Sequence, residues 1–198
     1  MKPSTVEVRG EGRLAKAVSR ALTSSGMELV PRRGDRVVAF GPVAEAGAVV
    51  VDLEGRAGAP GQCVLHAQVA LRGRYPAPWA TLFERLLQGR PLRLGWCARV
   101  DVVTREDLEA AVVFAVQQGV VGDWRVPSAG SSTELAVGRA LLVETGSSSV
   151  LGPAWRPRLG GVPVGDPLPG LRPAQTTEDA ARAWIALYQK DRSDLARG

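Results

Sequence analysis

The stretch VEVRGEGRLAKAVSRALTSSGMELVPRR, residues 6–33, decides the fold of this chain. It has the pattern of a strand, a glycine turn, a helix and a second strand, with Gly10, Gly12 and Ala15 spaced as G-x-G-x-x-A. Apolar residues alternate before the turn and recur at helical spacing after it. This combination is the fingerprint of a dinucleotide-binding βαβ unit.

Each small residue of this turn has a physical role. Gly10 permits the tight turn out of the strand, Gly12 lets the backbone approach a pyrophosphate, and Ala15 lets the helix pack closely on the strand. The helix N-terminus adds unpaired N–H groups and a positive dipole end. The predicted pyrophosphate contacts are therefore Gly10, Gly12, Arg13, Leu14 and Ala15. A βαβ unit with a tight turn and no ligand is the alternative interpretation.

The residues after the second strand bear on the choice of nucleotide. An acidic residue at this point would pair with the ribose hydroxyls of NAD, but the chain has Arg32 and Arg33. Two guanidinium groups suit a 2′-phosphate, so the sequence favours NADP(H) over NAD(H), unless both arginines belong to a solvated turn. Phe40 and Gly41, at the end of a third strand, are expected beside the adenosine.

Composition places the chain among ordinary globular proteins. It has 198 residues, of which 45% are hydrophobic and 23% charged, enough for one core with a small appendage. No apolar run reaches the roughly 20 residues that span a bilayer, and no signal peptide begins the chain, so we expect a cytoplasmic protein with no membrane partner. The five tryptophans offer apolar area of the kind that interfaces use, although a core position is the default for each.

The titratable and sulfur-containing residues predict no metal site. His66 is the one histidine, and Cys63 and Cys97 lack C-x-x-C spacing, so both thiols are expected to be small core residues. The net charge of +5 comes almost entirely from scattered arginines. Because these neither cluster nor alternate with aromatic residues, a nucleic-acid partner is not expected.

The rest of the chain alternates short strand and helix patterns. Strands are expected at 36–41, 48–53, 63–71 and 124–127, and helices around 79–89, after Thr104, at 133–145 and after a cap at Thr177, with an irregular stretch at 147–172. The connections between the strands at 36–41, 48–53 and 63–71 are too short for crossover helices. Either those helices are trimmed to loops, or part of the sheet is antiparallel. The predicted fold is α/β and Rossmann-like, with a mostly parallel sheet: residues 1–75 form the dinucleotide-binding core, and 76–198 complete the fold with a small helical lobe.

The order of these pieces resembles the extended and atypical short-chain dehydrogenase/reductase superfamily, in its epimerase/dehydratase-like branch. GEGRLA stands at the place of the family's glycine-rich turn, and VALRGRYPAP resembles its strand that ends in an arginine before a Tyr-Gly-Pro loop. LFERLLQGRPLRLG, ARVDVVTREDLEAAVVFAV, DWRVPSAGSSTELA and GLRPAQTTEDAARAWI are similar to later segments of the family, in the same order. The resemblance implies a nicotinamide cofactor.

The family's catalytic pair is missing. Family enzymes use Tyr-x-x-x-Lys, in which the lysine lowers the pKa of the tyrosine. Here Trp79 follows Tyr75 by four residues and Arg192 follows Tyr188, and the catalytic helix of the family is deleted between Phe40 and Gln62. The leading hypothesis is a degenerate NADP(H)-binding protein with a sensor, regulatory or partner-binding role, as a homodimer or with another protein.

Two alternatives remain open at the level of sequence. One is an active oxidoreductase or epimerase with an unusual acid/base, for which Tyr75, His66, Asp52 and Asp107 are the available groups. For each of these four residues, a purely structural role is the competing interpretation. The other is an interaction scaffold that no longer binds nucleotide, because Glu11 places a negative charge within the turn.

Overall fold

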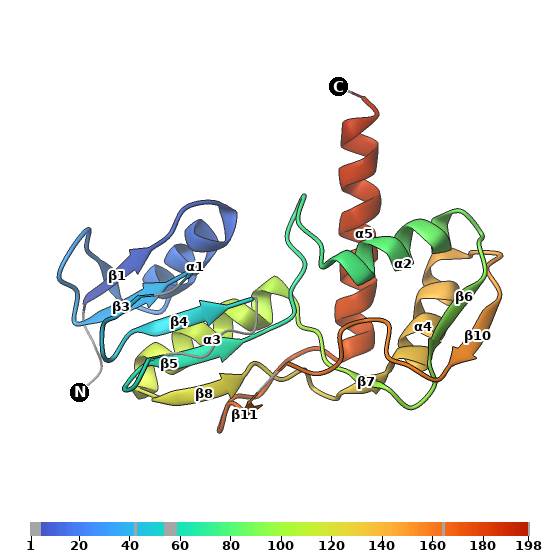
Figure 1. Ribbon diagram of the computed structural model, residues 1–198. Coiled ribbons are helices and arrows are strands. Elements are labelled where there is room, and N and C mark those ends of the chain that lie inside the picture. Colours follow the sequence, from blue (N-terminus) through green and yellow to red (C-terminus); the bar gives the residue numbers. More distant parts are fainter. Residues whose placement is uncertain (1–4, 42, 54–58, 164, 198) are drawn as a thin grey trace. The chain divides into compact units, whose positions relative to one another are not determined.

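A computed structural model describes residues 5–41, 43–53, 59–163 and 165–197 (Figure 1). The chain forms two compact units. Unit 1 comprises residues 1–67, 105–126 and 163–172, and unit 2 comprises residues 68–104, 127–162 and 173–198. The chain therefore passes between the units more than once, whereas the sequence suggests one boundary after residue 75.

Unit 1 contains a seven-stranded sheet in the order β11-β8-β5-β4-β3-β1-β2. Every neighbouring pair of its strands is parallel, as expected for a Rossmann-like α/β fold. The strands are β1 (Thr5–Arg9), β2 (Glu28–Leu29), β3 (Arg36–Ala39), β4 (Val49–Asp52), β5 (Cys63–His66), β8 (Gly122–Arg125) and β11 (Asp166–Pro167).

Two helices of unit 1 pack against each other and against the sheet: α1 (Arg13–Ser24) and α3 (Arg105–Gln118). Helix α1 buries a stripe of apolar residues that includes Val18 and Leu22. Val6 on β1 and Val38 on β3 are fully buried as well. Burial along β1 does not follow the alternation of VEVR, because Glu7 is buried as well and Val8 is only half-buried.

Strands β3 and β4 are parallel to each other, and so are β4 and β5. The described residues of the two connections contain no helix; residues 42 and 54–58 lie outside the described part. Of the two possibilities left by the sequence, trimmed crossovers are therefore confirmed for this part of the sheet. The side chain of Gln62 ties the short loops together. Its Nε2 donates to the carbonyls of Val43, at 2.7 Å, and Glu45, at 3.2 Å, and its Oε1 accepts from the N–H of Ala59 at 2.9 Å.

Unit 2 consists of three helices and two small sheets. Its elements are α2 (Ala77–Leu87), β6 (Leu92–Gly95), β7 (Arg99–Val100), β9 (Ser132–Thr133), α4 (Glu134–Thr145), β10 (Leu151–Ala154) and α5 (Thr177–Leu195). Strand β6 pairs in parallel with β10, and β7 pairs antiparallel with β9. Aromatic side chains fill the core between the helices, where Trp79 and Trp184 meet edge to face with ring centroids 4.9 Å apart.

A buried carboxylate joins three segments of unit 2. Glu134, at the start of α4, is fully buried, and it accepts backbone N–H groups from Gly95 at 2.8 Å, Arg158 at 2.7 Å and Leu159 at 2.6 Å. Its own N–H donates to the carbonyl of Ala98. Because the carboxylate has several donors, burial of its charge is compensated.

Several local expectations are wrong. The segment 147–172 is not wholly irregular, since it contains β10 and β11. The expected long strand at 63–71 ends at His66, and Thr176 rather than Thr177 caps α5, in a capping box with Asp179. Cys63 is buried as expected, and burial raises the pKa of its thiol to about 12, but Cys97 is exposed. The capping box of Thr176 and Asp179 is a local pattern that the sequence already contained, whereas the exposure of Cys97 depends on the tertiary environment.

Candidate functional site at the glycine turn

The glycine turn joins β1 to α1 with two residues that only glycine occupies without strain. Gly10 has φ 149° and Gly12 has φ 95°. A Cβ at Gly10 would lie 2.9 Å from Cδ2 of Phe40, so the absence of a side chain lets the Phe40 ring close onto the turn. A Cβ at Gly12 would meet nothing within 4 Å. The Phe40 ring therefore covers the turn at Gly10, whereas the space beside Gly12 is open.

The N-terminus of α1 has no side-chain cap. Gly12 occupies the N-cap position, no acidic residue lies in the first turn, and the first intrahelical bond at this end joins Lys16 N–H to Gly12 C=O. The N–H groups of Arg13, Leu14 and Ala15 precede that bond and point out of the helix. The side chains of Leu14 and Ala15 are buried in the core, so these two residues offer only their backbone to a ligand.

Of the residues expected beside the adenosine, Phe40 lies next to the glycine turn. Phe40 N–H donates to the carbonyl of Arg9 at 3.1 Å, which places the end of β3 beside the glycine turn. Gly41 has φ 134° and open space at its Cβ position. Arg32 and Arg33 are exposed, and the backbone N–H of Arg33 donates to Oε2 of Glu7 at 3.0 Å, with Arg33 in the left-handed region at φ 60°.

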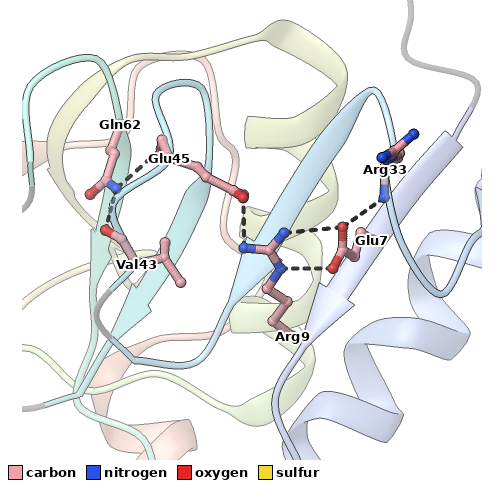
Figure 2. A network of polar contacts seen from close by, with 6 residues as sticks. All are labelled: Glu7, Arg9, Arg33, Val43, Glu45 and Gln62. Carbon is pink, nitrogen blue, oxygen red and sulfur yellow. Dashed lines mark hydrogen bonds and ion pairs between the residues drawn. The ribbon is translucent and has the colours of Figure 1, made fainter.

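A charged network includes Glu7, Arg9 and Glu45, none of which is a candidate from the sequence, and the backbone N–H of Arg33 joins it (Figure 2). The guanidinium of Arg9 lies between two carboxylates, with Nε 2.7 Å from Oε1 of Glu7 and Nη1 2.8 Å from Oε2 of Glu45. The hydrogen bond from Arg9 and the N–H of Arg33 lower the pKa of Glu7 against the opposing effect of burial. The signal was present in VEVR, since residues two apart on a strand share a face.

This network borders a pocket of about 440 Å³ in unit 1. Its lining combines β1 with the start of β3 and with the two segments that precede β3 and β4: Glu7, Arg9, Arg33–Val37 and Glu45–Ala48. Of the residues expected to bind the cofactor, the lining includes Arg33 alone. Because Arg9 is already paired on both sides, its charge is neutralised within the protein.

A second polar pair stands at the carboxyl ends of β4 and β5. His66 Nδ1 lies 3.1 Å from Oδ2 of Asp52, and His66 Nε2 lies 3.7 Å from Oδ1 of Asp123 on β8. The side chains of His66 and Asp52 are buried, whereas that of Asp123 is 54% exposed. The sequence named Asp52 and His66 separately as available groups, and the parallel register brings them together.

The other acid/base candidates are held by structural contacts. In unit 2, Tyr75 Oη donates to Oδ2 of Asp191 at 2.7 Å, and its ring packs against Phe83 and Tyr188. Burial and this hydrogen bond raise the pKa of Tyr75, which opposes formation of a phenolate. Asp107 is buried in the first turn of α3. Among the described residues, no group of three or more His, Cys, Asp and Glu side chains is arranged to hold a metal ion.

No protein-family model matches the chain, and no curated protein matches it by sequence. Solved structures do match. A dTDP-4-dehydrorhamnose reductase of Clostridium acetobutylicum is 10% identical at a TM-score of 0.61, over 93% of this chain and 99% of the other. The UDP-glucose 4-epimerase of Thermus thermophilus, in complex with NAD, is 16% identical at 0.61, with the same coverage. RMD from Pseudomonas aeruginosa, complexed with NADPH, is 11% identical at 0.65, over 94% and 99%.

At these identities the likeness establishes the fold. The chain has a Rossmann-like α/β fold with a mostly parallel sheet, as the sequence predicts, and it shares this fold with the three solved structures. None of the helices in the described part of the chain is long and apolar enough to cross a membrane.

Proposed function

We propose that this chain binds a nicotinamide dinucleotide, NADP(H) in preference to NAD(H), and acts as a sensor, regulator or partner subunit without the chemistry of a Tyr-Lys pair. The observation that carries the proposal is the open, uncapped N-terminus of α1 at Gly12. Free N–H groups at the positive end of a helix bind phosphate. Structures of the same fold contain NAD or NADPH, which supports the same class of ligand here.

The preference for NADP(H) rests on Arg32 and Arg33. Both follow β2 closely in sequence, at the place where the fold presents residues to the adenosine ribose. Both side chains are exposed, so a 2′-phosphate can reach them. Two guanidinium groups with no acidic residue between them suit a dianionic phosphate better than a ribose diol.

The absence of family-type catalysis rests on the tyrosines. Tyr75 and Tyr188 belong to one aromatic cluster in unit 2, and neither is followed by a lysine four residues later. Burial and the hydrogen bond to Asp191 raise the pKa of Tyr75 further above its ordinary value, so the phenol is neutral. A phenol in this state is poorly suited to remove a proton from a substrate.

Thermal melting of the whole chain with NADPH, NADP, NADH and NAD at millimolar concentration tests the proposal. A ligand at 100 times its Kd adds about 2.7 kcal/mol to stability, which is several degrees in Tm for a chain of this size. A shift with NADPH and NADP that exceeds the shift with NADH and NAD supports it. No shift with any of the four contradicts it and favours the scaffold alternative, in which the charge of Glu11 disfavours a pyrophosphate at the turn.

A pair of glycine variants separates loss of binding from loss of fold. Gly12 and Gly26 both have positive φ, at 95° and 82°, and both have open space at the Cβ position. Gly12→Ala and Gly26→Ala therefore carry similar backbone strain, of order 1–3 kcal/mol. Only Gly12→Ala is expected to lose the cofactor-dependent shift.

A second candidate function is an active oxidoreductase or epimerase that uses Asp52 and His66. The observation in its favour is that this pair ends two parallel strands, at the edge where α/β folds bind ligands. An Asp that orients a His is a recurrent general-base arrangement. Turnover of NADPH with a panel of nucleotide-sugar and carbonyl substrates, abolished by His66→Gln, would support this alternative over the first.

A further inference from the structure

Two tryptophans of unit 2 are exposed side by side. Trp96 directly follows β6 and Trp155 directly follows β10, and these strands pair in parallel (Figure 1), with Trp96 N–H donating to the carbonyl of Ala154. Trp96 is 53% exposed and Trp155 is 90% exposed. Their rings meet edge to face with centroids 6.2 Å apart. This geometry places an aromatic protrusion at the end of a two-stranded sheet.

The polar atoms of these two indoles are available. The buried tryptophans of unit 2 donate their indole N–H to backbone carbonyls, Trp79 to Leu159 and Trp184 to Val103. Within the described part of the chain, neither Trp96 nor Trp155 has such an acceptor. A tryptophan with an exposed apolar body and an unused donor is typical of binding surfaces.

Four exposed arginines lie close to the two tryptophans in the sequence. Arg93 and Arg99 lie three residues on either side of Trp96, and Arg156 and Arg158 follow Trp155; all four are exposed. Elsewhere in the chain, arginines such as Arg72 and Arg182 pair with carboxylates. Of these four, Arg99 donates to the hydroxyl of Ser131, and no described carboxylate forms an ion pair with any of them. Their positive charge is therefore not neutralised within unit 2.

The distribution of charge over the whole sequence has the same bias. Unit 2 contains 13 Lys and Arg against 8 Asp and Glu, whereas unit 1 contains 12 of each. The formal net charge of +5 therefore resides in unit 2. A partner of unit 2 is expected to be acidic, because complementary charge raises the association rate and selects the partner.

We propose that Trp96, Trp155, Arg93, Arg99, Arg156 and Arg158 form a docking surface for an acidic segment of a protein partner; this extends the partner-binding part of the proposed function. Tryptophan and arginine are the residues that most often dominate the energy of protein interfaces. The partner segment supplies carboxylates to the arginines and an apolar side chain to the tryptophan pair.

Size and charge favour a short acidic segment over a second copy. The two tryptophans expose roughly 350 Å², taking about 250 Å² for a whole side chain. A stable globular interface buries about 800 Å² on each partner, so the pair suits an anchor for a peptide-like segment. A two-fold contact between copies would bring like charges of unit 2 together.

The ring geometry favours protein over single-stranded nucleic acid. The two ring planes lie 83° apart, so their free faces are nearly perpendicular. Successive bases of a single strand stack on rings that form a continuous ledge, which this pair does not offer.

Selection of a displayed library of random peptides, each about a dozen residues long, on the immobilised full-length chain tests the proposal. We expect enriched peptides rich in Asp and Glu with at least one apolar residue. Their binding should weaken about tenfold or more in Trp155→Ala and in Arg156→Glu. Two matched controls should bind as the parent does: Val143→Ala, which removes an exposed apolar side chain of α4, and Lys190→Glu, which reverses a charge on α5.

Several outcomes would overturn the proposal: no enriched peptide, enriched peptides without acidic residues, or peptides that bind Trp155→Ala as tightly as the parent. Two further measurements would show whether the surface binds nucleic acid, a membrane or a second copy of the chain instead. Binding of an oligothymidylate or of phosphatidylserine vesicles through Trp155, with no acidic peptide recovered, assigns the surface to nucleic acid or membrane. A dimer in light scattering that Trp155→Ala dissociates assigns it to a second copy. The NADPH-dependent melting shift should persist in Trp155→Ala, so failure here is distinguishable from failure of cofactor binding.

Discussion

The imidazole of His66 lies 3.1 Å from the carboxylate of Asp52, and both residues end neighbouring parallel strands. The two are 14 positions apart in the sequence, and the register between β4 and β5 makes them direct partners. Both side chains are buried. A polar pair in this position stabilises the sheet, and it stands at the edge that carries ligands in this class of fold.

Removing the imidazole should destabilise unit 1. In His66→Leu the buried Asp52 carboxylate loses this donor, at a cost of about 1–3 kcal/mol. The double variant with Asp52→Leu should cost less than the sum of the two single changes, because the two groups interact directly. Urea unfolding measures both. Asp123→Asn is the control, since that carboxylate is 54% exposed and lies 3.7 Å from the ring, and its effect should stay within about 0.5 kcal/mol.

Glu134 should be the most sensitive carboxylate of unit 2. Glu134→Gln replaces one acceptor oxygen with a donor that faces the N–H groups of Gly95, Arg158 and Leu159. The expected loss is about 2–4 kcal/mol, because charge-assisted bonds are lost and buried donors are left unsatisfied. Glu144→Gln, at the other end of α4, removes only a 3.9 Å contact between exposed side chains and should change stability by less than about 0.5 kcal/mol. Equal effects of the two changes in urea unfolding would contradict this role for Glu134.

The Tyr75–Asp191 hydrogen bond should make stability depend on pH at both ends of the scale. Burial raises the pKa of Asp191, but hydrogen bonds from Tyr75, Gly73 and Arg72 together lower it by more. The pKa of Asp191 therefore lies below the usual 3.8. Its contribution is therefore present above about pH 4 and lost as the pH falls through its folded-state value. Burial and Asp191 raise the pKa of Tyr75 above the usual 10, so stability should also fall above about pH 10, where only the unfolded chain ionises.

Tyr75→Phe should flatten both limbs of that profile. The substitution removes the ionising phenol and one of the donors that lower the pKa of Asp191. Tyr188→Phe, in the same aromatic cluster, is the control and should keep the acid limb of the parent. Unfolding by urea between about pH 2.5 and pH 11 provides the measurement, and an unchanged profile in Tyr75→Phe would show that this pair does not govern the pH dependence.

The cofactor preference should reside in two arginines. The double change Arg32→Ser and Arg33→Ser is expected to weaken NADPH binding about tenfold or more, which is about 1.4 kcal/mol, and to leave NADH binding unchanged. The double change Arg20→Ser and Arg90→Ser, at two other exposed arginines, removes the same two charges and is the control. Calorimetric titration distinguishes the cases: an equal loss for both cofactors would place these arginines away from the 2′-phosphate.

Much of the fold follows from local pattern. The strand–turn–helix of residues 6–33 is confirmed, because helical spacing fixes which face of α1 is buried. Gly10 and Gly12 both have positive φ, at 149° and 95°, as a tight turn after β1 requires. The contacts of a cofactor with Gly10–Ala15, Arg32, Arg33, Phe40 and Gly41 stay predictions.

Other features depend on contacts between distant segments. The sequence left open whether the shortened connections meant trimmed crossovers or an antiparallel sheet, because local patterns do not encode strand direction. The role of Glu134 was not visible, since three of its donors belong to segments 24 to 39 residues away. The five tryptophans also looked alike in sequence, yet two of them are buried in unit 2 and two are exposed.

The sequence by itself determined the βαβ unit, the α/β class and the absence of any Tyr-x-x-x-Lys spacing, because each depends on residue types at short, fixed spacings. Only the tertiary structure decided that the seven strands run parallel, that His66 meets Asp52, and that Trp96 and Trp155 stand exposed side by side. The physical reason is that strand register and burial are properties of the whole packed chain. They depend on which distant segment covers each residue, and the sequence does not state this locally.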